Sequence, residues 1–383
     1  MPKRRGHGEG ALYPRRDKAG KVERWIGVVD LGPDPATGKR RQYRISGRTK
    51  REVQDELARA LDDKAKDQLT PNDRRTVGEY LTLWLESVAR PRVAARTYEG
   101  YQTIVEHHVI PALGDTRLQR LGPQDLQALY TRLGAGHSAQ TVRNIHRCIH
   151  TALETALRWG LVSRNVADLV DAPRVSRREQ RYLSPGQARA LLAAATTDPL
   201  ECYYVLALTT GMREGELLAL KWADVCEGTI RLQRSLAETA DGWVEKDLKS
   251  HQSRAISLAP IAVAALKRQK VRQAKQWLRA GARYQDRGYV LTSGAGSHLR
   301  PQNILRRSFL PLLERAGLPR IRLYDLRHSA ASLLLATGAH PKVVAELLGH
   351  SSVKLTLDTY SHALPTLQGE AIGRLDELLR GES

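Results

Sequence analysis

Near the C-terminal end of the chain stand four polar side chains that could bind and attack a phosphate. Arg327, His328, His350 and Tyr360 fall within the stretch from Tyr324 to Tyr360 and are separated by apolar helical segments. A guanidinium and an imidazole can hold a phosphate, and a tyrosine hydroxyl can attack its phosphorus atom. The same spacing would also suit ordinary polar residues on a helical domain, so the rest of the chain must decide.

Two more cations lie earlier in the sequence, next to predicted turns. A helix predicted over residues 199–210 ends at Gly211, and Arg213 follows at the start of the next helix. Glu216 lies one helical turn further and could orient the Arg213 guanidinium, or the two could be a surface ion pair that contributes little. Lys249 lies in the predicted turn before the segment SRAISL. It could deliver a proton from the tip of a hairpin, or it could be an ordinary turn residue.

The elements that must position these side chains are mostly helical. Ser184 followed by Pro185 is a typical helix start. Apolar periodicity predicts further helices over residues 260–280, 301–316, 324–337, 341–348 and 353–362, and a last amphipathic helix over 366–380. That last helix could dock on its own domain or on a neighbouring subunit. The segments TIRLQRS, DGWVEKDLKS and SRAISLA predict a three-stranded antiparallel sheet.

An all-helical module is predicted over residues 72–170. Thr76 and Glu79 form a capping box, and an apolar stripe follows them at helical spacing. We expect Pro91 and the basic run around Arg92 and Arg96 to break this helix, and Pro111 to end the next one. The module ends with a predicted helix from Ser138 to Trp159. Its polar side chains, Arg143, His146, Arg147 and His150, could form a solvated face or contact phosphates.

The first 68 residues predict a small basic domain. Residues 1–16 are expected to be a loop, and residues 25–30 and 41–45 are expected to be strands joined by the turn-rich segment GPDPATGKR. Thr49, with Glu52 three positions later, predicts a capped helix. A basic hairpin of this kind could enter a DNA groove.

Charge defines the class of partner. The 383 residues include 61 Lys and Arg against 41 Asp and Glu, so the net charge is +20. A chain this basic typically binds a polyanion, most often nucleic acid, with an anionic membrane surface as the alternative. No apolar run approaches the roughly 18 residues of a membrane span, and the start lacks the apolar segment of a signal peptide. The three separated cysteines, Cys148, Cys202 and Cys226, predict reduced thiols in a cytoplasmic protein.

Taken in order, Arg213, Lys249, Arg327, His350 and Tyr360 resemble the tyrosine recombinase, or phage integrase, family. The motifs are TGMREGELLAL, the LKS turn, DLRHSAASLLLATG, LLGHSS and TLDTYSH. The resemblance covers residues 182–383, expected to be a mainly helical catalytic domain with a small antiparallel sheet. It implies a helical core-binding domain over 72–170, a linker over 171–181, and an arm-type DNA-binding domain of sheet plus helix over 1–68, as in lambda-like integrases.

The resemblance also implies an enzyme that cleaves and rejoins DNA through a 3′-phosphotyrosyl bond. Tyr360 would be the nucleophile, and Arg213 and Arg327 would stabilise the charge on the phosphate oxygens. Lys249 would protonate the leaving oxygen, and His350 would position or deprotonate Tyr360. No metal or other cofactor is expected.

Other residues have smaller implied roles. Glu216 would orient Arg213, and His328 would support the site through the backbone. Tyr324 stands where the family usually has histidine, and at neutral pH it can donate a hydrogen bond but carries no positive charge. Lys246 is the alternative to Lys249 as general acid.

The expected partners are double-stranded DNA at attachment sites, three further copies of the chain in a tetramer on paired duplexes, and accessory bending or excisionase proteins. Two other functions use the same scaffold. One is a DNA-binding regulator without catalysis, against which the full set of motifs argues. The other is a type IB topoisomerase, which the N-terminal domain disfavours.

Overall fold

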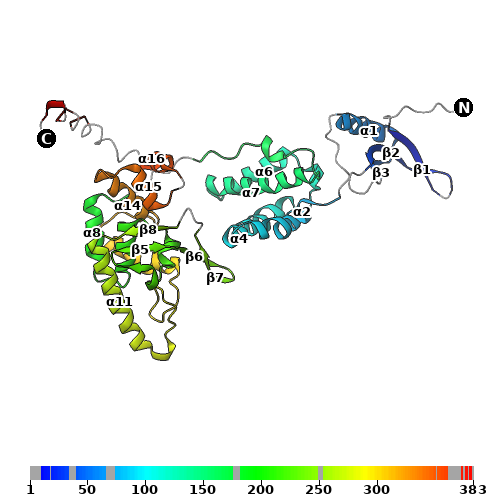
Figure 1. The fold of residues 1–383 in the computed structure, drawn as a ribbon. Helices are drawn as coiled ribbons and strands as arrows, with labels where there is room; N and C mark the ends of the chain where they lie inside the picture. Colours follow the sequence, from blue (N-terminus) through cyan, green and yellow to red (C-terminus); the bar gives the residue numbers. More distant parts are fainter. Residues whose placement is uncertain are drawn as a thin grey trace. The chain divides into compact units, whose positions relative to one another are not determined.

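A computed structural model describes residues 10–17, 19–33, 40–65, 74–175, 182–248, 253–350 and 352–360, with residues 372–373, 376–377 and 379–381 near the C-terminus. The chain divides into two compact units, Met1–Arg177 and Arg178–Ser383 (Figure 1). Within the described ranges, no helix is long and apolar enough to cross a membrane.

The first unit begins with a three-stranded antiparallel sheet covered by one helix. The strands β1 (Ala11–Arg16), β2 (Val22–Pro33) and β3 (Arg40–Gly47) pair in that order, and α1 (Lys50–Ala65) contacts β2 and β3. Their shared core consists of Val29, Ile45, Val53, Leu57 and Ala60. The predicted capping box is half formed: the Glu52 N–H donates to Thr49 Oγ1 at 3.3 Å, whereas Glu52 Oε2 accepts from the Arg48 N–H at 3.2 Å.

The strand β1 corrects the prediction that residues 1–16 form a loop. Its register with β2 begins with Ala11 opposite Val28. Its basic side chains and Pro14 hide a strand from pattern analysis, but a proline is tolerated at a sheet edge, where one side of the backbone makes no ladder bonds. Most of the predicted connection GPDPATGKR, residues 34–39, lies outside the described residues.

A helical module completes the first unit. Its main helices are α2 (Val77–Trp84), α4 (Ala95–Ile104), α6 (Pro123–Gly134) and α7 (Ala139–Arg158). The capping box at the start of α2 is confirmed: the Glu79 N–H donates to Thr76 Oγ1 at 3.2 Å, and the Thr76 N–H donates to Glu79 Oε2 at 2.8 Å. Ser138 caps α7, whose bounds agree with the helix predicted from Ser138 to Trp159.

Two prolines that we expected to end helices lie one and two residues before the ends of those helices. After α2 a π-helical turn, Leu85–Ala89, leads into α3 (Arg90–Arg92), which contains Pro91. After α4 a second such turn, Val105–Val109, leads into α5 (Ile110–Leu113), which contains Pro111. A proline lacks an N–H and clashes with the carbonyl four residues before it. The wider π turn removes this conflict, so the helix continues past the proline.

At the centre of the second unit is α9 (Glu201–Thr210). It contacts α8 (Pro185–Ala195), α10 (Glu214–Leu218), α11 (Pro260–Ala280) and α14 (Asp325–Ala336). Its sequence is apolar on nearly all sides, as expected for a helix buried all round, and nine of its side chains are buried. The turn that follows α9, where Arg213 stands, is therefore held by the core.

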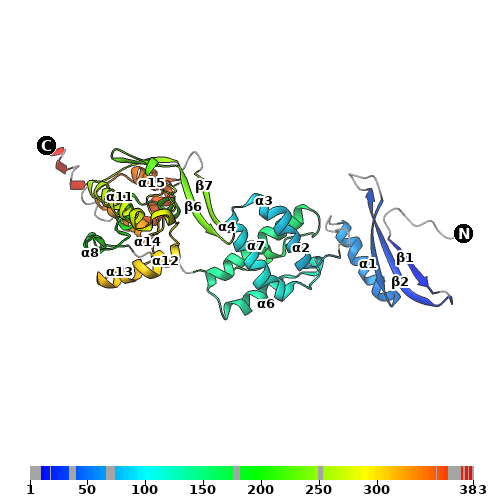
Figure 2. The ribbon, with the colours of Figure 1, turned by 90° about the horizontal axis from the view of Figure 1, so that it is seen from below.

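The predicted three-stranded sheet has the wrong pairing. β5 (Thr229–Leu232) lies between β4 (Val225–Cys226) and β8 (Arg254–Ser257), whereas β6 (Arg234–Thr239) and β7 (Gly242–Asp247) form a separate hairpin, visible in Figure 2. The strand predicted over residues 229–235 thus divides at Gln233. β6 leaves the sheet and contacts α10. Gly215 permits this approach, because a Cβ there would overlap Ser235 Oγ.

The remaining helices carry the second half of the candidate site. α14 contacts α9 and α15 (Pro341–Leu348), and α15 contacts α16 (Val353–Tyr360) and β8. The start of the helix predicted over 301–316 is α12 (Pro301–Asn303), which continues through the π turn Ile304–Phe309 into α13 (Leu310–Arg315). The last predicted helix, over residues 366–380, lies largely outside the described residues.

Candidate active site

Arg213 is fixed by the turn between α9 and α10. Gly211 ends α9 in the left-handed conformation, with φ of 61°, and Arg213 is the N-cap of α10. Its backbone N–H donates to Glu216 Oε2 and its Nη1 to Glu216 Oε1, both at 2.9 Å. The Arg213 side chain is 34% exposed and that of Glu216 only 1%. The predicted role of Glu216 in orienting Arg213 agrees with these contacts.

Glu216 is held from its other side by Arg254, the first residue of β8. Arg254 Nη2 donates to Glu216 Oε2 at 2.9 Å and Nη1 to Glu216 Oε1 at 3.2 Å. Burial by itself raises the pKa of Glu216, but the hydrogen bonds and charges of Arg254 and Arg213 outweigh it, and the net pKa is lowered. This carboxylate is therefore ionised and shared between two guanidinium groups.

Arg327, on α14, is buried, with 3% of its surface exposed. Its Nη1 donates to the carbonyl oxygen of Gly211 at 2.6 Å and its Nη2 to that of Leu348 at 2.7 Å. It therefore joins the end of α9 to the end of α15, across 116 and 21 positions of sequence. The structure thus brings Arg213 and Arg327 together at these two helix ends.

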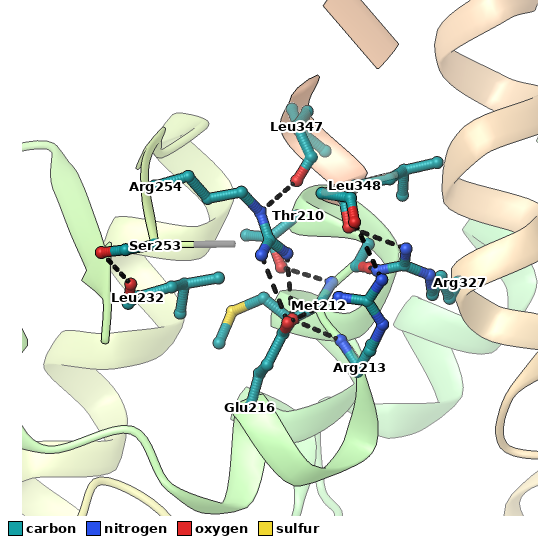
Figure 3. A network of polar contacts seen from close by, with 12 residues as sticks. Thr210, Met212, Arg213, Glu216, Leu232, Ser253, Arg254, Arg327, Leu347 and Leu348 are labelled. Atoms are coloured by element: carbon teal, nitrogen blue, oxygen red, sulfur yellow. Dashed lines mark hydrogen bonds and ion pairs between the residues drawn. The ribbon is translucent and has the colours of Figure 1, made fainter. Parts of the chain in front are cut away.

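At the end of α15, three successive carbonyl groups each accept from a different arginine. Leu347 O accepts from Arg254 Nε at 2.7 Å, Leu348 O from Arg327, and Gly349 O from Arg213 Nη2 at 2.9 Å (Figure 3). The last carbonyls of a helix lack partners within the helix and carry the negative end of its dipole. The end of α15 therefore gathers three guanidinium groups through backbone contacts alone.

The imidazole of His350 follows directly. Gly349 ends α15 with φ of 67°, and the His350 Nδ1 lies 2.7 Å from Thr356 Oγ1 on α16. Burial, and then the positive charges of Arg327 and Arg213, lower the pKa of His350 to about 4. His350 is thus neutral at pH 7, with one ring nitrogen as donor and the other as acceptor.

Tyr324 and His328 lie one turn apart at the start of α14. Their rings are 5.1 Å apart between centroids and meet edge to face. Tyr324 is 48% exposed and lines a cavity of about 640 Å³ together with Glu214, Arg320 and Arg322. Burial lowers the pKa of His328. Tyr324 is therefore accessible, whereas His328 is half-buried.

Three predicted residues lie in or next to segments outside the described part of the structure. Lys249 lies outside the described residues, between β7 and β8. Lys246 is exposed in β7, opposite Ser235. The backbone of Tyr360 ends α16, one turn after Thr356, and its side chain is outside the described part of the structure.

Two residues of the network were not predicted. We interpreted Arg254 only as part of the predicted strand SRAISLA. Its place at the start of that strand, directly after the turn that contains Lys249, could have indicated a site residue. Thr356, fully buried four residues before Tyr360, was overlooked within TLDTY. No sequence pattern could show that Arg327 or Arg254 would bind backbone carbonyls.

Comparison with known families matches both units. Residues 181–366 match the phage integrase family, and residues 76–134 match the family of phage integrase N-terminal SAM-like domains. An integrase of Streptomyces ambofaciens is 31% identical over 387 residues, which cover 97% of each chain.

Solved structures have the same fold. The Tn1549 transposon integrase in complex with a circular intermediate DNA aligns with a TM-score of 0.66 at 21% identity, over 79% of this chain and 99% of that one. A lambda integrase tetramer bound to a Holliday junction aligns with a TM-score of 0.56 at 20% identity, over 89% of this chain and 95% of that one.

Proposed function

Because this chain belongs to the phage integrase family of tyrosine recombinases, we propose that it is the integrase of a phage or another mobile element. It breaks and rejoins DNA strands at specific sites. The observation that carries the proposal is the pair of arginines, Arg213 and Arg327, held at the ends of α9 and α15 beside a neutral His350.

Tyr360 is the proposed nucleophile. Its hydroxyl oxygen bonds to the scissile phosphorus, its proton is lost, and the bond to the 5′ oxygen breaks, which leaves a 3′-phosphotyrosyl link. A 5′ hydroxyl from a second strand reverses the step, so no external energy source is needed. The free pKa of a tyrosine is about 10, so at neutral pH the Tyr360 hydroxyl still carries its proton. A neighbouring group must accept that proton before or during the attack.

Positive charge is the main protein contribution to this step. The transition state gathers negative charge on the non-bridging oxygens, where Arg213 and Arg327 supply fixed donors. Removing such a donor typically slows a reaction by about a hundred- to a thousandfold. Lys249, or Lys246 in its place, protonates the leaving oxygen as general acid.

His350 acts as a neutral group in this proposal. When the Thr356 hydroxyl donates to Nδ1, the opposite nitrogen carries the hydrogen and donates to a phosphate oxygen. In the other tautomer the opposite nitrogen accepts the Tyr360 proton. Tyr324 donates a hydrogen bond to the phosphate in place of the usual histidine, while Glu216 orients Arg213 and His328 supports the start of α14.

The other domains hold the DNA. We assign residues 1–68 to an arm-type DNA-binding domain, 72–170 to a core-binding domain, 171–181 to a linker and 182–383 to the catalytic domain. Tyr13 is 44% exposed on β1 of the basic N-terminal sheet, which suits entry of the sheet into a groove. The net charge of +20 supports many phosphate contacts.

Recombination joins two duplexes, so the working form we propose is a tetramer on paired attachment sites. The last helix contacts a neighbouring subunit, and accessory bending or excisionase proteins set the direction of the reaction. Since its proposed substrate is DNA, we expect the protein to act in the cytoplasm.

Covalent trapping tests the nucleophile. The substrate is a nicked duplex that carries the attachment core found in the DNA flanking the gene, so that cleavage releases a short strand and cannot be reversed. Wild-type protein should form a denaturant-resistant adduct, whereas Tyr360→Phe should bind equally well and form none. An adduct with Tyr360→Phe would refute the assignment.

The same assay separates the alternatives. A regulator would bind the duplex without any wild-type adduct. A type IB topoisomerase would relax supercoiled DNA but would not exchange strands between two duplexes.

A further inference from the structure

Arg254 has no assigned role in the reaction, although it lies at the centre of the polar network in Figure 3. Its side chain is 10% exposed, and both oxygens of Glu216 accept from it. A buried guanidinium with two carboxylate contacts is a costly arrangement unless every charge is compensated. The contacts therefore call for an explanation beyond packing.

The net charge of the named side chains in this network depends on Arg254. Arg213, Arg254 and Arg327 carry three positive charges, Glu216 carries one negative charge, and His350 is neutral at pH 7. With Arg254 present, the charge of Glu216 is cancelled and two positive charges remain. A phosphodiester carries one negative charge, and the transition state for attack on it gathers a second.

Removal of Arg254 would change what Glu216 binds. Arg213 is the other cation bonded to this carboxylate in the described network, through Nη1 and the backbone N–H. Without Arg254, the Arg213 guanidinium would alone have to compensate the buried carboxylate, to which it already donates at 2.9 Å. The charge that Arg213 presents to a phosphate would then be largely neutralised.

Arg254 also fixes the second half of the site. Its Nε donates to Leu347 O, two residues before Gly349, where a Cβ would lie 2.8 Å from Arg254 Nη1. One side chain therefore contacts the carboxylate that orients Arg213 and the helix end that precedes His350. It reaches both while almost fully buried, so it acts through these groups and not through the DNA.

We infer that Arg254 is a positioning residue for strand cleavage: it cancels the charge of Glu216 and holds the end of α15, so that Arg213 and His350 face the phosphate. The inference rests on the proposed function of the site.

The test compares full-length variants in single-turnover cleavage of the nicked duplex. The variants are Arg254→Gln, Arg254→Lys, and Arg254→Gln combined with Glu216→Gln. Each is also tested on a duplex with a methylphosphonate at the scissile position, which lacks one negatively charged oxygen. Thermal unfolding and DNA affinity are measured for every variant.

Arg254→Gln should slow cleavage of the natural phosphate by roughly ten- to a hundredfold, less than loss of a donor that contacts the transition state. The loss should be smaller on the methylphosphonate, where less charge develops. The double variant should recover most of the rate, since a glutamine at position 216 can still accept from Arg213. Arg254→Lys, which keeps the charge but not the two-point contact, should fall between wild type and Arg254→Gln.

Three results would overturn the inference: wild-type cleavage by Arg254→Gln, equal losses on both substrates, or no recovery in the double variant. If Arg254→Gln does not fold, the double variant decides, because it leaves no uncompensated charge. A folded double variant as slow as Arg213→Ala would then contradict the inference. Failure of the proposed function has a different result, since wild-type protein would form no Tyr360-dependent adduct.

Discussion

The turn after α9 and the turn after α15 share a left-handed glycine but differ in their surroundings. Each ends its helix at a left-handed glycine, and each presents a polar side chain within two residues, Arg213 and His350. A Cβ at Gly211 would meet Leu348 Cδ2 at 2.5 Å, whereas a Cβ at Gly349 would meet the Arg254 guanidinium. The first turn is set in apolar packing and the second among cations, so damage to the first should affect folding and damage to the second should affect chemistry.

Arg327 connects the two turns, and its loss should have the largest effect. Arg327→Ala should reduce cleavage at least a hundredfold and also destabilise the protein, because Gly211 O and Leu348 O lose their donor, at about 1–3 kcal/mol for each buried group left unpaired. Arg213→Ala should cost a similar factor in cleavage but less stability, since its side chain is 34% exposed. Urea unfolding and single-turnover cleavage measure both. Equal destabilisation by the two variants would show that the turns are not held differently.

The glycines test the comparison directly. Alanine in a left-handed conformation is strained by about 1–2 kcal/mol. Gly211→Ala adds a clash with the apolar core and should lower the free energy of unfolding by more than Gly349→Ala. Gly349→Ala should instead displace Arg254 and slow cleavage by more than its effect on stability implies. The reverse order would contradict the assignment of the two environments.

The pH dependence of stability reports on the second turn. His350 has a pKa of about 4 in the folded protein and about 6.5 in an unfolded chain. Between these values the unfolded chain binds more protons, so stability rises with pH across this window and is lost as pH falls from about 6.5 toward 4. Unfolding at several pH values should show a smaller slope for His350→Gln than for wild type. An unchanged slope would mean that His350 is not held neutral.

Thr356 should give the smallest effect. Thr356→Val keeps the shape but removes the hydroxyl next to His350 Nδ1, which should slow cleavage by about two- to tenfold, as for one neutral hydrogen bond. Thr356→Ser retains the hydroxyl and serves as the control. A loss as large as that of Arg213→Ala would give Thr356 a direct role in the reaction.

Most helices of the second unit follow from local sequence signals. The cap at Ser184 and the glycines that end α9 and α15 define their boundaries without tertiary information. The pairing of β5 with β8 does not follow from local signals. It requires β6 to leave the sheet, and β6 can do so because Gly215 allows it to approach closely. The prolines in α3 and α5 misled the prediction for a similar reason: local rules describe the α-helix, and a π turn changes which carbonyl a proline meets.

Site residues divide in the same way. Arg213, Arg327 and His350 stand in motifs and were predicted from sequence. Arg254 was missed because its partners, Glu216 and Leu347, lie 38 and 93 positions away. Backbone acceptors carry no residue type, so a pattern of side chains cannot reveal them.

The end of α15 also affects the energetics of DNA binding. An ordered arginine side chain loses up to about 2 kcal/mol of rotamer entropy, and three of them would be a substantial penalty if DNA had to impose the order. Here the carbonyls of Leu347, Leu348 and Gly349 hold the guanidinium groups before DNA arrives. Folding has therefore already ordered these cations, and the end of α15 fixes their positions for the anion that the site binds.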